Sequence, residues 1–415
     1  MPLVGGCDGL GLGSGAVYAG GRSFGSSITL DGDRALVAAR ASSGAFVLRR
    51  QGDDWDTESP LDPPDGFLTD DPARSISYAL SVALEGDVAV IGAPVLGVAT
   101  RSVPGRAFVF ERDSDGWRRT AEFRAADPSL GRPFGRAVAV SGGQIAVLEG
   151  AATERITANL VEPAAVVFYE RSGRGWAETN RVEETEYERP TWAGGVSLFG
   201  NAFAVDRDRL VVASEGQDVD GRRSAGTVRV YERRGPTWSL TQTLSPPTLQ
   251  ENDALGAEVA LDGSLLAATA PGRDATEGAG AGSVFAFRER AGRWVLEAEL
   301  RLSDVRGGSQ YGFSVAASGD RIAVGDVGRA ASRGSVFVWV RRPSGEWDLE
   351  AELWPAGLGR RSARASPSRA TGYWSGPSVS EAVAALSTSS DAAPTGGRSR
   401  KRLALEDDGS ARASS

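Results

Sequence analysis

Short runs that alternate apolar and polar residues recur along most of this chain. The runs Leu296–Leu300 and Leu349–Leu353 both read Leu, Glu, Ala, Glu, Leu. Tight polar dipeptides such as Gly86-Asp87 and Asp262-Gly263 separate many such runs. A period of two residues indicates β-strands with one buried face, and Gly-Asp or Asp-Gly turns favour hairpins between them. The pattern therefore predicts an all-β chain built from successive hairpins.

One pattern of landmarks is repeated six times. Each copy starts with an aromatic residue or Leu followed by a small residue, and the six copies begin at Phe24, Tyr78, Phe134, Phe199, Leu255 and Tyr311. Two apolar runs follow, then a third run that usually begins with Gly, as in Gly105, Gly226, Gly282 and Gly334. A further turn then leads to a Trp in every copy, namely Trp55, Trp117, Trp176, Trp238, Trp294 and Trp347. We assign these Trp residues a structural role, because a position that recurs in every unit is not a unique site.

Four strands per unit and more than fifty residues per unit are typical of a β-propeller. A single four-stranded sheet of this composition cannot bury both of its faces, so each sheet has to pack against its neighbours. We therefore expect an all-β fold, a β-propeller of four-stranded antiparallel blades.

The run Ser81–Pro94 carries a recognisable signature, Ser-Val-Ala-Leu followed by Gly-Asp and ending in Gly-Ala-Pro. Together with the aromatic-Gly pairs and the later Trp, it resembles the FG-GAP repeat of integrin α-subunit propellers, and more closely the bacterial-type FG-GAP repeat proteins. The resemblance covers roughly residues 22–355, although the Gly-Ala-Pro signature has decayed elsewhere, for example to Ala213-Ser214-Glu215. It implies a non-catalytic propeller used in binding or adhesion.

The ends of the chain decide the number of blades and the domain boundaries. Residues 375–386 look like two strands of a further unit, and residues 15–18 look like an isolated third strand. Propellers that close with strands from both termini leave no exposed edges, so we expect seven blades, the last of them degenerate and composite; six blades plus tails is the alternative. We divide the chain into a Gly-rich segment at 1–21 with a possible closing strand, propeller repeats at 22–356, a linker and degenerate blade at 357–390, and a disordered tail at 391–415.

The amino-acid composition excludes several kinds of catalytic and metal site. The 415 residues include no His, one Cys and a single Lys. Catalytic triads with His, His-ligated metals, internal disulfides and cysteine zinc sites are thus excluded, and Lys401 lies in a polar tail unsuited to a Schiff base. The net charge of −8 argues against nucleic-acid binding. We expect no cofactor, no transmembrane segment and a monomer.

The resemblance to integrins raises the question of calcium. Integrin propellers carry calcium loops between the first two strands of a blade, but the corresponding turns here, such as Asp31–Asp33 and Glu85–Asp87, are short hairpins. Calcium takes six to eight oxygen ligands, and a two-residue hairpin supplies at most two carboxylates. We therefore expect no metal in these turns. Asp218-Val219-Asp220-Gly221 contains an Asp-x-Asp-Gly core, which we interpret as an ordinary polar turn.

Insertions are confined to the connections between strands 2 and 3 and between blades, which share one face of the disc. The longest lie around the third blade, at Glu149–Pro163 and Glu178–Val196. Loops on a rigid ring often carry binding residues. The candidate ligand-binding residues are Glu184, Glu186, Tyr187, Arg189, Trp192, Asp218, Asp220 and Arg222. A solvated acidic loop is the alternative interpretation.

Two functions remain open. The first is a non-catalytic, adhesion-like propeller that presents loops on one face to a protein or a glycan. The second is a propeller hydrolase or lyase that uses paired carboxylates in the axial funnel, because that chemistry needs no His. The resemblance favours an extracellular or cell-surface location. The chain as given starts without a signal peptide, although Val4-Gly5-Gly6-Cys7 is similar to the end of a lipoprotein signal.

Overall fold

A computed structural model describes the propeller region and two short strands near the C-terminus. The described residues are 24–355, 401–405 and 411–414, apart from gaps at 40–43, 53, 65–66, 68–77, 95–104, 126–133, 151–163, 185–198, 201, 274–280, 304–309 and 327–334. Within this part of the chain, no helix has the length and apolar character needed to span a membrane.

Six groups of four antiparallel strands, here called blades 1 to 6, follow one another along the chain, and the sheet of blade 6 contains two further strands. Blades 1 and 2 contain β1 (Phe24–Asp31), β2 (Arg34–Ala39), β3 (Gly44–Gln51) and β4 (Asp54–Leu61), then β5 (Ser81–Glu85), β6 (Val88–Ala93), β7 (Arg106–Asp113) and β8 (Gly116–Arg124). Blades 3 and 4 contain β9 (Phe134–Ser141), β10 (Gln144–Glu149), β11 (Ala165–Ser172) and β12 (Gly175–Glu183), then β13 (Phe203–Asp206), β14 (Arg209–Ser214), β15 (Thr227–Arg234) and β16 (Thr237–Leu244). Blades 5 and 6 contain β17 (Val259–Asp262), β18 (Leu265–Ala270), β19 (Ser283–Arg290) and β20 (Arg293–Leu300), then β21 (Tyr311–Ser318), β22 (Arg321–Asp326), β23 (Ser335–Arg341) and β24 (Trp347–Pro355).

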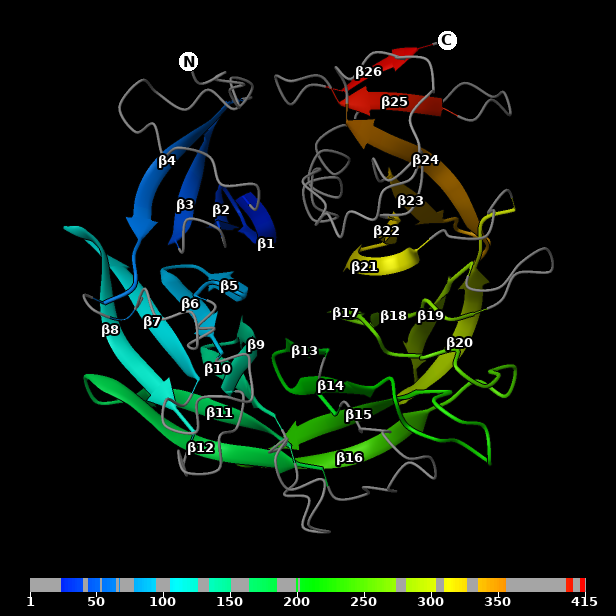
Figure 1. The fold of residues 1–415 in the computed structure, drawn as a ribbon, viewed down its shortest axis with the longest axis horizontal. Helices are drawn as coiled ribbons and strands as arrows, with labels where there is room; N and C mark the ends of the chain where they lie inside the picture. Colours follow the sequence, from blue (N-terminus) through cyan, green and yellow to red (C-terminus); the bar gives the residue numbers. More distant parts are fainter. Residues whose placement is uncertain are drawn as a thin grey trace, which may run out of the picture.

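The blades stand around a common axis, with the first strand of each blade near the axis and the fourth strand at the rim (Figure 1). Turns between strands 1 and 2 and between strands 3 and 4 share one face, the turn face. Connections between strands 2 and 3 and between consecutive blades share the other face, the connection face. The predicted all-β propeller of four-stranded antiparallel blades is confirmed.

The two ends of the ring differ in part from the prediction. The composite seventh blade was expected from residues 15–18 and 375–386, which lie outside the described residues, so it stays a prediction. The tail at 391–415 was expected to be disordered, whereas the structure places β25 (Lys401–Leu405) and β26 (Ala411–Ser414) there. Strand β25 pairs in parallel with the rim strand β24, whose outer edge offers unpaired backbone groups to any extended segment.

Apolar residues between neighbouring blades form the core. The contact between two consecutive blades is called a seam. In the seam of blades 1 and 2, Leu36 packs with Ile91 and Phe108, all of them 0% exposed. Equivalent clusters fill the four following seams. Burial of apolar surface at every seam, at about 25 cal/mol per Å², holds the blades in a ring.

The glycine in the third-strand landmark is required where two blades approach closely. At Gly226 a Cβ atom would lie 2.2 Å from the backbone oxygen of Leu255 in the next blade, and φ is +84°. Both facts exclude a larger residue without displacement of the backbone. The landmark therefore marks a point where the main chains of consecutive blades touch.

Candidate functional site

Polar side chains on the turn face link each blade to the next. The side chains of Asp31, Asp206 and Asp262 accept hydrogen bonds from the backbone N–H groups of Gly86, Gly263 and Gly319, at 2.5, 2.8 and 2.6 Å. Glu85 accepts from Gly142 and Gly143, and Ser141 accepts from Arg207 at 3.0 Å. The carboxylates of these short hairpins thus have a structural role, because each satisfies a backbone donor in the following blade.

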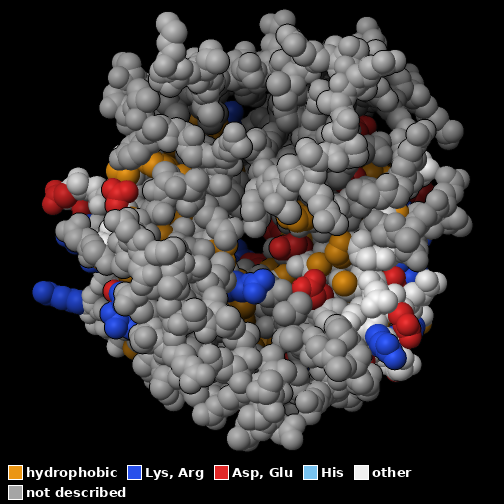
Figure 2. Space-filling model, viewed as in Figure 1, with side chains coloured by type: hydrophobic (Ala, Val, Ile, Leu, Met, Phe, Trp, Pro, Cys, Tyr) orange, Lys and Arg blue, Asp and Glu red, His pale blue; other side chains and the backbone are white. Residues whose placement is uncertain are grey.

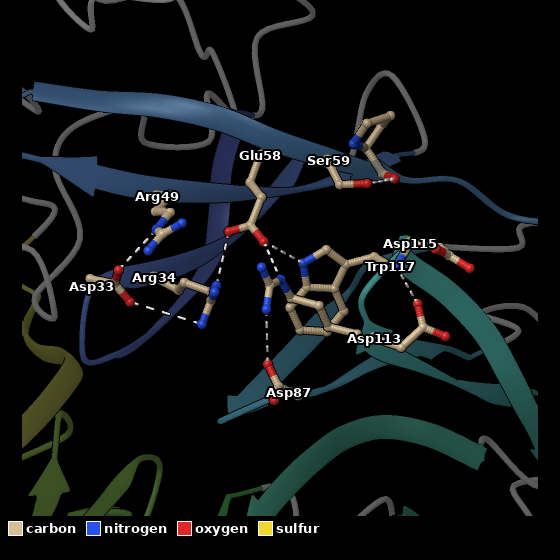
Figure 3. Close-up of polar contacts among 11 residues, drawn as sticks. Asp33, Arg34, Arg49, Glu58, Ser59, Asp87, Asp113, Asp115 and Trp117 are labelled. Carbon is tan, nitrogen blue, oxygen red and sulfur yellow. Dashed lines mark hydrogen bonds and ion pairs between the residues drawn. The ribbon is translucent and has the colours of Figure 1, made fainter.

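At the rim, carboxylates join Arg and Trp side chains of the following blade. Glu58 on β4 accepts hydrogen bonds from Arg34 of its own blade, and from Arg112 and the Trp117 indole of blade 2, at 2.9, 2.7 and 3.2 Å (Figure 3). Glu111 accepts from the indole of Trp176 in the same way, at 2.8 Å. These repeat Trp residues therefore hold blades together.

Glu297 on β20 forms the most extensive of these rim clusters. Its side chain is 7% exposed and accepts hydrogen bonds from Arg341, Trp347 and Arg290. Burial alone would raise the pKa of Glu297, but these hydrogen bonds outweigh it and lower the pKa to about 2. A hollow of about 660 Å³ opens beside this cluster along β20 and β24. Its central carboxylate, Glu297, already pairs with the guanidinium of Arg341 in blade 6.

A second pocket lies on the connection face, at the axial ends of blades 5 and 6. Its volume is about 570 Å³, and it is lined by Ala257, Glu258, Pro271, Gly272, Gln310, Gly312 and Phe313. Phe313 is 56% exposed, more than any other large apolar side chain in the described residues. Figure 2 shows apolar and carboxylate side chains side by side near the centre of the disc. An aromatic face beside a carboxylate suits a group that carries both apolar carbon and positive charge.

Glu258 differs from the rim carboxylates in its electrostatics. The side chain of Glu258 is open to solvent on one side, while the surrounding protein displaces much of the water around its carboxyl group. This partial desolvation disfavours the charged form and raises the pKa of Glu258 to about 7. The negative charge of Glu215, at the end of β14 in blade 4, raises that pKa further. The backbone N–H of Glu258 donates to Thr269 Oγ1 at 3.0 Å, which fixes the main chain below the carboxyl. Near neutral pH this carboxyl can therefore hold or release a proton.

None of the predicted ligand-binding residues that the structure describes lines this pocket. Glu186, Tyr187, Arg189 and Trp192 lie outside the described residues. Glu184 is buried, with 6% of its surface exposed, directly after β12.

The Asp218–Arg222 turn is held by its own contacts. Asp218 accepts from the backbone N–H of Ser224 at 2.9 Å, and Arg222 donates to the backbone oxygens of Pro247 and Leu249. Asp220 is exposed and pairs with Arg222 at 2.9 Å. Within the described ranges, no group of three or more Asp, Glu, Cys or His side chains is placed to hold a metal ion.

Sequence reasoning missed Glu258, although a local signal exists. Aligned on the aromatic-Gly landmark, Glu258 occupies the position of Ser81 and Ser314 in other blades, and it is the only carboxylate there among the six copies. Glu215 likewise replaces the Pro of the Gly-Ala-Pro signature, as seen at Pro94. Both departures from the repeat point to the same place in the ring.

Comparison with known proteins agrees with the repeat pattern. The model of the FG-GAP repeat matches residues 294–339, which run from the Trp of blade 5 to β23 of blade 6. The structure is thus a β-propeller in which residues 294–339 match an FG-GAP repeat. No curated protein matches this propeller. Among solved structures, a match is a candidate 6-phosphogluconolactonase from Bacteroides uniformis, at 11% identity and a TM-score of 0.46, covering 78% of this chain and 83% of that chain.

Proposed function

We propose that this FG-GAP propeller is a non-catalytic binding protein whose ligand, a protein or a glycan, lies across the connection face. The pocket at Glu258 and Phe313 carries the proposal. On the turn face and at the rim, carboxylates such as Asp31 and Glu58 already bind donors of a neighbouring blade, whereas Glu258 and Phe313 open to solvent in a hollow. Such a pocket, with few polar groups and an apolar wall, is a typical ligand site.

The chemistry of the pocket selects the group that enters it. A carboxylate and an exposed phenyl ring together favour an amine or guanidinium, because the charge pairs with the carboxylate and the ring attracts cations. We propose that the ligand inserts an amine, from a Lys side chain or an amino sugar. The insertion Glu178–Val196, with Glu184, Glu186, Tyr187, Arg189 and Trp192, is proposed as a second contact. An extracellular or cell-surface role in adhesion follows the same family resemblance.

An array of glycans and proteins, probed with the purified full chain, would test the proposal. For each ligand found, we expect Glu258→Gln and Phe313→Ala to weaken binding at least tenfold. Glu251→Gln is the matched control, since Glu251 is exposed after β16 and outside the pocket. Binding that is equal in all four proteins would contradict the placement of the ligand.

A second candidate function rests on the pair Glu258 and Glu215. A carboxyl whose pKa is raised to about 7, beside a second carboxylate, has the properties of a general acid with a partner base. We propose hydrolysis or elimination on a glycan as the reaction this pair could support. Chromogenic glycosides test it: turnover that is lost in both Glu258→Gln and Glu215→Gln supports catalysis, and absence of turnover across a broad panel supports binding alone.

A further inference from the structure

Arg229 in blade 4 breaks the repeat at a core position. When the third strands are aligned on the residue nine or ten positions before each repeat Trp, the other five blades carry Phe46, Phe108, Val167, Phe285 and Phe337 at this place. Those five side chains are apolar, and each is between 0 and 7% exposed. Arg229 is 5% exposed. A guanidinium thus occupies a position that the fold otherwise fills with a phenyl ring or an isopropyl group.

The guanidinium of Arg229 has little compensation for its burial. Its NH1 donates to Ser214 Oγ at 3.0 Å, and no carboxylate of the described residues forms an ion pair with it. The other buried Arg of the described residues, Arg273, is paired: it lies 2.6 Å from Asp253 and also forms an ion pair with Glu299. A buried charge without a counter-charge is strongly destabilising. The position therefore calls for an anion that the described part of the chain does not supply.

Three hydroxyl groups form a row beside this guanidinium. Ser214 and Thr227 are the last register pair of β14 and β15, and the Val228–Leu244 pair places Ser245 opposite Thr227 on the third strand of the row. Residues opposite one another in antiparallel strands point to the same face, which here is the face of blade 4 toward blade 3. Thr227 Oγ1 and Ser245 Oγ are buried and have no hydrogen-bond partner. Buried hydroxyls without partners are rare in folded proteins.

From this arrangement we propose that Arg229, with the hydroxyls of Ser214, Thr227 and Ser245, binds an oxyanion in the seam of blades 3 and 4. The guanidinium offers several N–H donors in a plane that matches carboxylate or phosphate oxygens, and each hydroxyl can rotate to donate. The row lies where β14 ends and β15 begins, so the site faces the connection side of the disc. It takes a negatively charged group and is distinct from the pocket at Glu258, which takes a positive one.

Thermal melting and calorimetry of the full chain with inorganic phosphate, sulfate and acetate test this site. Ionic strength is held constant with chloride. We expect a saturable rise in melting temperature with at least one of these oxyanions; a preference for phosphate or sulfate indicates a tetrahedral ligand, and a preference for acetate indicates a carboxylate. If the melting temperature of the wild type shows no saturable rise with any of the three anions, the proposal is refuted, and ordered water is then what satisfies these polar groups.

Variants locate the effect. Arg229→Met should abolish the rise and, without oxyanion, should melt no lower than wild type, because five blades already hold an apolar residue there. Thr227→Val keeps the shape of the side chain and should weaken oxyanion binding at least fivefold while leaving the basal melting temperature unchanged or higher. Arg207→Gln, an exposed charge on the turn face of the same blade, should keep the full rise. If Arg229→Met fails to fold, Thr227→Val decides alone, and a full rise in Thr227→Val overturns the assignment.

Discussion

Replacement of Glu297 by Gln should loosen the seam between blades 5 and 6 more than any single rim substitution of equal size. The carboxylate accepts two hydrogen bonds from Arg341, both 2.8 Å long, one from Arg290 at 2.8 Å and one from the Trp347 indole at 3.3 Å. Gln keeps the shape but removes the charge that these donors share. Three cationic or polar donors would then face a neutral amide.

The magnitude follows from the pKa of Glu297. A pKa lowered from 4.5 to about 2 corresponds to about 3 kcal/mol of interaction with the charged form, at ~1.4 kcal/mol per pKa unit. For a ring of roughly 330 residues, with an unfolding entropy of ~2.1 cal/mol/K per residue, that loss lowers Tm by about 4–5 °C. The stabilisation is present above pH 4.5 and is lost as the pH falls through 4.5 toward 2.

Thermal melts of the wild type and Glu297→Gln between pH 7 and pH 2.5 provide the assay. The two melting temperatures should differ at pH 7 and converge as the pH approaches 2.5. Glu350→Gln is the matched control, because Glu350 occupies the same place in blade 6, is 30% exposed and pairs only with Arg321 in the described structure; it should cost at most about 1 kcal/mol. Equal losses in the two variants, or a difference independent of pH, would refute the reasoning.

Three further predictions follow from the same structure. Gly226→Ala should lower the melting temperature by several degrees, since the added Cβ would lie 2.2 Å from the backbone oxygen of Leu255. Gly32→Ala places its Cβ in open space at a similar positive φ, and its melting temperature should fall less. The melting temperature should be the same in millimolar calcium as in EDTA, because the turn-face carboxylates already accept hydrogen bonds from backbone N–H groups. A melting temperature many degrees higher in calcium would show a calcium site. Glu258→Gln should match the wild type in stability at pH 4 and be more stable by roughly 1 kcal/mol at pH 8. Because the pKa of Glu258 is raised, the wild type loses stability as the pH rises from 4.5 through about 7, and solvent screens part of this effect. A wild type that is more stable than the variant at pH 8 would contradict this.

The strands and their grouping into blades could be predicted because they depend on local features. Alternation with a period of two, Gly-containing turns and the recurring Trp are all visible within one repeat. The partners of those Trp residues were not visible, since Glu58 and Trp117 are 59 positions apart and come from two blades. Such contacts depend on how blades stand around the axis, which one repeat does not specify.

The candidate sites were harder to predict for a related reason. Loop length directed attention to the insertions around blade 3, but Glu258, Glu215 and Arg229 lie in or beside strands of ordinary length. Their signal is a break in the repeat: a carboxylate where other blades have Ser or Pro, and a guanidinium where they have Phe or Val. Comparison of equivalent positions between blades therefore identifies chemistry that loop length alone does not.

Hydrogen exchange of the full chain, with and without a ligand from the array, tests most directly whether the connection face carries the function. Bound ligand should protect the amides at 255–259 and 310–314 around the pocket, and should leave the turn-face hairpins at 31–33, 85–87, 206–208 and 262–264 unchanged. Protection confined to those hairpins, with none at the pocket, would contradict the account.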